Sequence, residues 1–172
     1  MGQRLTIDIL DNGEKIAIIY YHWSAYFVST IYELKDVKDD IAKAKAEGKD
    51  VLLAIIDGLE RRGGGLDISP RTREAAKKEW PDREFKTDIN RNDGLICIEE
   101  KDIEETFNMS EGWASIDIST EEVGDEVDLE MGLHFKVPEL PVNPFDHDMS
   151  FEELDKLYEY IKAEVEKSFK KG

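Results

Sequence analysis

A tight turn near the start of the chain constrains the fold more than any other feature. Asp11-Asn12-Gly13-Glu14 combines residues that tolerate the positive backbone φ required between two paired strands. Before this turn, residues 4–10 alternate apolar and polar side chains, which predicts a strand with one buried side. After it, residues 15–21 are almost continuously apolar, which predicts a strand buried on both faces. The chain therefore begins with a β-hairpin on which a sheet can be built.

The segment that follows the hairpin is unusually rich in rings, with four aromatic side chains and a histidine in residues 20–26. Because large aromatic side chains are costly to leave in water, we expect most of them to fill the core and to tie the hairpin to the first helix. We call the following residues the aromatic joint: Tyr21, His22, Trp23 and Tyr26. Ser24, between them, is predicted to cap the helix that follows.

The rest of the sequence predicts several further helices and strands. Apolar periodicity indicates helices within residues 24–34, 37–44 and 51–59, and Ser69-Pro70 begins another that ends before Pro81. Strands are expected at 94–98, 113–118 and 126–137, with the last two forming a second hairpin whose outer face is acidic. A short helix is expected near 102–107. Ser150 and Glu153 form a capping box at the start of a C-terminal helix.

These elements predict the α+β class, with a mostly antiparallel sheet of about five strands, inserted helices and a C-terminal helix. We expect a single domain over residues 1–172. Within it, residues 1–137 would hold the sheet and the inserted helices, 138–149 a proline-rich connector, and 150–171 the last helix.

The charge of the chain limits its partners. Its 172 residues carry a net charge of −17, which disfavours direct binding to nucleic acid or to an anionic membrane. Residues 1–98 hold 18 acidic and 16 basic side chains, whereas residues 99–172 hold 22 and 7. The single cysteine and the absence of a long apolar run favour a protein of the reducing cytoplasm.

The acidic second half has two interpretations. It is either a solvated surface or an interface that presents carboxylates to a basic protein, in place of the phosphates of a nucleic acid. In the second case, the predicted partner-binding residues are Asp117, Glu121, Glu122, Asp128 and Glu130. The partner would be a basic protein such as a nuclease. A self-assembling module that binds a second copy of the chain is a further alternative.

A hydrolase is the alternative of a different class, with His22 as general base and Ser24 as nucleophile. The two residues lie two positions apart, but the sequence shows no third group that would orient the histidine. A structural histidine is the competing interpretation, and we assign no catalytic residue.

A metal site is the second chemical alternative. Residues 88–99 place oxygen side chains and a final glutamate at several positions of a calcium-binding loop, but the glycine comes one place late. The turn from Asp88 to Asp93 that feeds a strand explains the same residues without metal. No cofactor and no metal ligand are therefore assigned.

Three segments carry a resemblance: residues 1–7, residues 20–26 and residues 90–96, which read MGQRLTI, YYHWSAY and NRNDGLI. The chain resembles, over about a third of its length, a group of small uncharacterised acidic proteins of phages and prophages of Gram-positive bacteria. The resemblance implies an accessory protein acting in the cytoplasm of the bacterial host. Small acidic proteins of that origin often inhibit a defence enzyme of the host, such as a CRISPR nuclease or a restriction enzyme. The expected function is therefore non-enzymatic binding and inhibition of such an enzyme.

Overall fold

The computed structural model describes residues 3–88, 93–99, 110–125 and 148–170 of the chain. These residues form one mixed sheet with the strand order β3-β4-β2-β1-β5-β6-β7. The strands are β1 (Leu5–Asp11), β2 (Glu14–Tyr21), β3 (Gly65–Leu66), β4 (Leu95–Cys97), β5 (Gly112–Asp117), β6 (Glu122–Asp125) and β7 (Met149–Ser150). The helices are α1 (Phe27–Glu47), α2 (Val51–Arg61), α3 (Pro70–Glu79) and α6 (Phe151–Lys170).

The first hairpin is confirmed, and it lies at the centre of the sheet. β1 pairs antiparallel with β2, and its other edge pairs in parallel with β5, with Ile7 opposite Ala114. β3 and β4 form a second parallel pair, while the remaining neighbours are antiparallel. The α+β class is therefore correct, but the sheet has seven described strands and two parallel pairs. The alternation of side chains predicts a strand without revealing its partner, which explains the difference.

A hairpin does follow β5, but its described return strand, β6, lies before the range that the sequence predicted. β5 turns directly into β6, and Ile116 pairs with Val123. The strand expected at 126–137 and the connector expected from 138 onward lie outside the described residues, except for the end of the connector at 148–149. The short helix expected near 102–107 also lies outside them.

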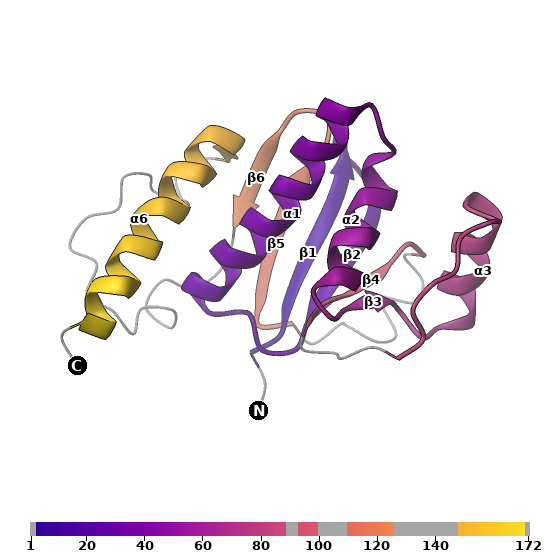
Figure 1. The fold of residues 1–172 in the computed structure, drawn as a ribbon, viewed down its shortest axis with the longest axis horizontal. Coiled ribbons are helices and arrows are strands. Elements are labelled where there is room, and N and C mark those ends of the chain that lie inside the picture. The colour runs from indigo at the N-terminus through magenta and orange to yellow at the C-terminus, as the bar shows by residue number, and fades with distance from the viewer. Residues whose placement is uncertain (1–2, 89–92, 100–109, 126–147, 171–172) are drawn as a thin grey trace.

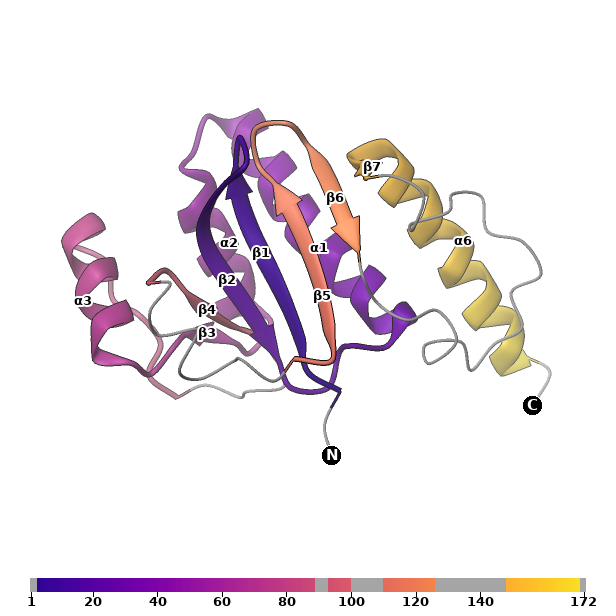
Figure 2. The same ribbon diagram turned by 180° about the vertical axis from the view of Figure 1, so that it is seen from behind.

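The helices are not distributed evenly around the sheet. α1 and α2 cross one face, α6 lies beside α1 beyond β6, and α3 lies at the other end, near β3 and β4 (Figure 1). Seen from behind, β1, β2, β5 and β6 have no described helix in front of them (Figure 2). The main core lies between the sheet and the helices, and it includes Leu5, Ile7, Ile9, Ile19, Phe27, Ile31, Leu34, Ile55, Leu59 and Leu157.

α1 is one continuous helix of 21 residues, where the sequence suggested two shorter ones. Its charged middle is held by contacts with other helices: Lys35 and Lys38 both bind the carboxylate of Asp155 in α6, at 2.8 and 2.7 Å. The helix begins at Phe27 with Tyr26 as its N-cap and no side-chain capping bond, so the predicted cap by Ser24 is wrong. By contrast, the capping box of α6 is confirmed by reciprocal bonds between Ser150 and Glu153.

α1 and α2 approach each other closely at a glycine. A Cβ atom added to Gly58 would lie 1.9 Å from Oδ2 of Asp40, whose carboxylate accepts a hydrogen bond from Nη2 of Arg62 at 3.0 Å. Only a residue without a side chain leaves room for this buried carboxylate. In the described ranges, no helix is both long and apolar enough to cross a membrane.

Candidate functional site

Two turns meet at one end of the sheet, because the parallel strands β1 and β5 end at the same edge. The turn after β1 contains Asp11 and Glu14, and the turn after β5 leads into Glu121 and Glu122. The backbone N–H of Ile118 donates to the carbonyl of Leu10 at 2.8 Å. The two turns lie side by side in Figure 2, and the hydroxyl of Ser119 donates to the Asp11 carboxylate.

The carboxylate of Asp117 holds these two turns together. It accepts the backbone N–H groups of Asn12 and Gly13 from the first turn, at 3.0 and 2.8 Å. It also accepts those of Ser119 and Thr120 from the second, at 2.9 and 3.1 Å. Burial would raise the pKa of Asp117, but the four N–H donors together lower it. Asp117 is only 6% exposed, so the expectation that it lies on an outer face is wrong. Asp117 therefore positions the two turns and contributes little to their exposed surface.

The remaining carboxylates of the two turns are exposed. We call Asp11, Glu14, Glu121 and Glu122 the acidic pole. Glu121 adopts a positive φ of 59°, and its Oε1 atom lies 2.9 Å from Nζ of Lys45 at the end of α1. Glu122 begins β6, where it pairs with Ser150 of β7. Two further predicted partner-binding residues, Asp128 and Glu130, lie outside the described residues.

The aromatic joint fills the core only in part. Tyr21 is buried, whereas Trp23 is 47% exposed and His22 and Tyr26 are half-buried. The hydroxyl of Tyr20 is hydrogen-bonded to Nδ1 of His22 at 2.8 Å, and the His22 and Trp23 rings meet edge to face with centroids 5.1 Å apart. The prediction that these rings tie the hairpin to the helix through the core therefore holds for Tyr21 and is wrong for Trp23.

The structure does not bring His22 and Ser24 together as a base and a nucleophile. Ser24 is buried, and its hydroxyl donates to Oε1 of Glu33 in α1 at 3.4 Å, while Nδ1 of His22 is engaged by Tyr20. No hydrogen bond joins the two side chains in the described part of the chain. Their arrangement matches the structural interpretation of His22.

Glu33 is the titratable residue that the sequence interpretation missed. Burial, followed by the nearby charge of Asp36, raises its pKa to about 7. Burial and Glu33 also raise the pKa of the Tyr21 hydroxyl. Arg62, at the end of α2, partly offsets the effect on both residues. The signal was present in the sequence, since the carboxylates of Glu33, Asp36 and Asp40 recur at helical spacing on one face of α1.

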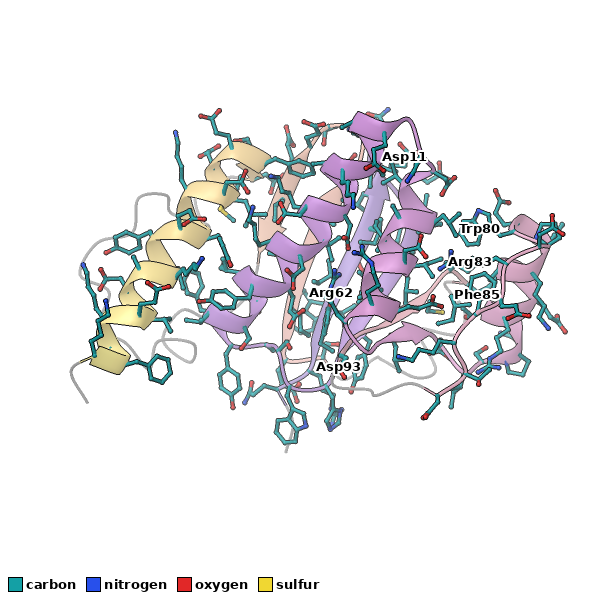
Figure 3. All side chains as sticks on the ribbon, in the orientation of Figure 1. Asp11, Arg62, Trp80, Arg83, Phe85 and Asp93 are labelled. Carbon is teal, nitrogen blue, oxygen red and sulfur yellow. The ribbon has the colours of Figure 1, made fainter. Side chains whose placement is uncertain are left out.

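The turn proposed as a metal loop lies beside the glycines that follow α2. A Cβ atom on Gly63 would lie 2.7 Å from Oδ2 of Asp93, and one on Gly64 would lie 2.1 Å from the carbonyl oxygen of Gly94. The glycines thus let two loops touch through their backbones, at the opposite end of the sheet from Asp11 (Figure 3). Residues 89–92 of the turn lie outside the described residues. In the described ranges, no cluster of three or more histidine, cysteine or carboxylate side chains could hold a metal.

Comparisons of the chain with protein families, with curated proteins and with solved structures found no match.

Proposed function

We propose that this chain is a non-enzymatic binding protein whose acidic pole contacts a basic surface of another protein. The observation that carries the proposal is the anchoring of both acidic turns by Asp117. Flexible surface carboxylates lose conformational entropy when they bind, whereas carboxylates on anchored turns lose less. Four acidic side chains from two turns, with one lysine bound among them, form a compact negative surface.

The finer proposal concerns the partner. A protein that inhibits a nucleic-acid-handling defence enzyme of a bacterial host can place carboxylates where the enzyme binds phosphates. Support comes from the steep excess of acidic residues in 99–172 and from the resemblance to phage and prophage proteins. The acidic pole would then occupy the basic nucleic-acid channel of a CRISPR nuclease or a restriction enzyme in the host cytoplasm.

The test is affinity capture by the tagged chain from nuclease-treated lysate of a Gram-positive host. Three baits are compared: the unchanged protein, Glu121→Lys/Glu122→Lys at the pole, and Glu159→Lys/Glu166→Lys on the exposed side of α6. The two variants have equal net charge, so only the position of the change differs.

We expect a stoichiometric basic protein that the pole variant fails to retain, that the α6 variant still retains, and that elutes as salt is raised. The captured protein is then assayed for nuclease activity with and without the chain. Equal retention by both variants would contradict the acidic pole as the interface, and an uninhibited enzyme would contradict the finer proposal. A chain that elutes as a dimer and captures nothing would instead favour the self-assembling alternative.

A further inference from the structure

A pocket of about 330 Å³, which no residue of the acidic pole lines, lies between α3 and the segment that follows it. It is lined chiefly by Leu66, Arg73, Lys77, Arg83, Phe85 and Lys86. Figure 3 shows Arg83 and Phe85 beside Trp80, between α2 and α3. Its volume lies within the range of about 300–1,000 Å³ typical of small-molecule sites.

The charge of this pocket is opposite to that of the chain. Four of its lining residues are cationic, in a protein with 40 acidic side chains. Arg83 is bound to the carboxylates of Asp57 and Glu60 in α2, and Glu84 adds a third carboxylate at the rim. For Arg73, Lys77 and Lys86, by contrast, the described part of the chain provides no carboxylate within ion-pair distance.

Two buried donors in the same place also lack an acceptor. The Nε atoms of Arg73 and Arg83 are covered by surrounding atoms and have no hydrogen-bond partner among the residues that the structure describes. A buried N–H without an acceptor is unfavourable, and native proteins rarely leave one unexplained. Arg83 is held by its two carboxylates, but a small rotation of the Arg73 guanidinium toward an anion in the pocket would give its Nε–H a partner. The exposed ammonium groups of Lys77 and Lys86 need no such rotation.

The pocket has an apolar side as well. Leu66, one of its lining residues, is buried. The centroid of the Phe85 ring lies 5.4 Å from Cζ of Arg83 and 6.3 Å from the centroid of the Trp80 ring. Such aromatic and guanidinium surfaces accept a flat ring, and cations accept phosphate oxygens. A ligand that satisfies both sides carries a phosphate and a planar base.

We propose that this pocket binds a nucleotide, with its phosphate held by Arg73, Lys77 and Lys86 and its base against Phe85. The proposal is independent of the function assigned to the acidic pole. Because the chain as a whole carries a net charge of −17, it disfavours a long polyanion, and the site is suited to a single nucleotide.

Isothermal titration calorimetry of the full chain tests this, with AMP, adenosine, inorganic phosphate and a short single-stranded oligonucleotide as separate probes. The matched variants are Lys77→Gln/Lys86→Gln at the pocket and Lys162→Gln/Lys170→Gln on α6, which remove equal charge from exposed positions. Phe85→Leu tests the contact with the base.

We expect AMP to bind more tightly than either adenosine or phosphate. The pocket double variant should weaken AMP binding at least about tenfold, while the α6 double variant leaves it unchanged. Phe85→Leu should reduce the preference for AMP over phosphate. Absence of AMP binding at about 1 mM, equal binding of AMP and phosphate, or equal loss in both double variants would overturn the proposal. Tighter binding of the oligonucleotide than of AMP, lost in the pocket variant, would overturn the assignment to a single nucleotide.

Discussion

The carboxylate of Asp117 in β5 accepts the backbone N–H of Gly13, which lies 104 positions earlier in the chain, at 2.8 Å. Through this bond and three others, one buried side chain fixes the geometry of two turns. The exposed carboxylates that we propose for partner binding are therefore positioned by a residue that is itself buried.

Replacing Asp117 with alanine should lower the free energy of unfolding by about 3 kcal/mol, because four backbone donors lose their acceptor. Asp117→Asn keeps one acceptor oxygen and should lose less. Chemical denaturation measures both, with Glu122→Ala as an exposed control that should stay within about 0.5 kcal/mol of the unchanged protein. If the denaturation midpoint of Asp117→Ala equalled that of the unchanged protein, the two turns would be shown to hold together without the Asp117 carboxylate.

Replacing Gly58 with alanine should destabilise the protein by about 2 kcal/mol, although the same change inside a helix is ordinarily stabilising. The new Cβ would displace the Asp40 carboxylate and break its bond to Arg62. In an Asp40→Ala background the loss should disappear, because the colliding group is gone. Thermal unfolding of the four proteins of this cycle measures the coupling, and an equal effect of Gly58→Ala in both backgrounds would refute the assignment.

Glu33 should make the protein less stable as the pH rises. The pKa of Glu33 is about 7 in the folded protein, against an ordinary value of 4.5. Between pH 4.5 and about 7 the folded protein therefore keeps a proton that the unfolded chain has released. The free energy of unfolding should therefore fall through that window, by up to about 3 kcal/mol. Glu33→Gln should remove most of this fall and be the more stable protein at pH 8. Denaturation curves recorded from pH 4 to pH 8 measure this pH dependence. If the free energy of unfolding of Glu33→Gln fell with pH as steeply as that of the unchanged protein, Glu33 would be excluded as the cause of the fall.

The contact between α1 and α6 should depend on salt and on acid. Burial raises the pKa of Asp155, but Lys35 and Lys38 outweigh it and lower the pKa overall. The stabilisation is therefore present above the unfolded pKa and lost as the pH falls through the lowered one. Asp155→Asn should reduce stability by about 1 kcal/mol at neutral pH and low salt. In about 1 M salt the difference should shrink, and a difference independent of salt would contradict an ionic origin.

The parts of the fold that depend on neighbouring residues were readable from the sequence. The turn at Asn12-Gly13, the start of α3 at Pro70 and the capping box of α6 each rest on residues within four positions of one another. The parallel pairing of β1 with β5 was not readable, since nothing in either strand specifies a partner more than a hundred residues away.

The sequence predicted two members of the acidic pole, Glu121 and Glu122, but not Asp11 and Glu14, whose turn meets the second turn only in the folded chain. The alternating pattern of β5 placed the side chains of Asp117 and Ile116 on opposite faces of the strand. It could not show that backbone groups of the first turn would cover the Asp117 carboxylate. The charged middle of α1 suggested a break between two helices. The sequence did not reveal that Lys38 binds Asp155, because the two residues are 117 positions apart. Most of the joint was assigned to the core, but Trp23 lies just beyond the end of β2, where no described element covers it fully.

The central position of β1 has a consequence for how the chain acquires its structure during synthesis. β1 pairs on one side with β2, which follows it directly, but its other edge waits for β5, more than a hundred residues later. At a translation rate of about 5–20 residues per second, that edge stays unpaired for several seconds. An unpaired apolar edge is a template for aggregation, so expression yield should depend on translation speed and on chaperones more than the stability of the finished sheet suggests.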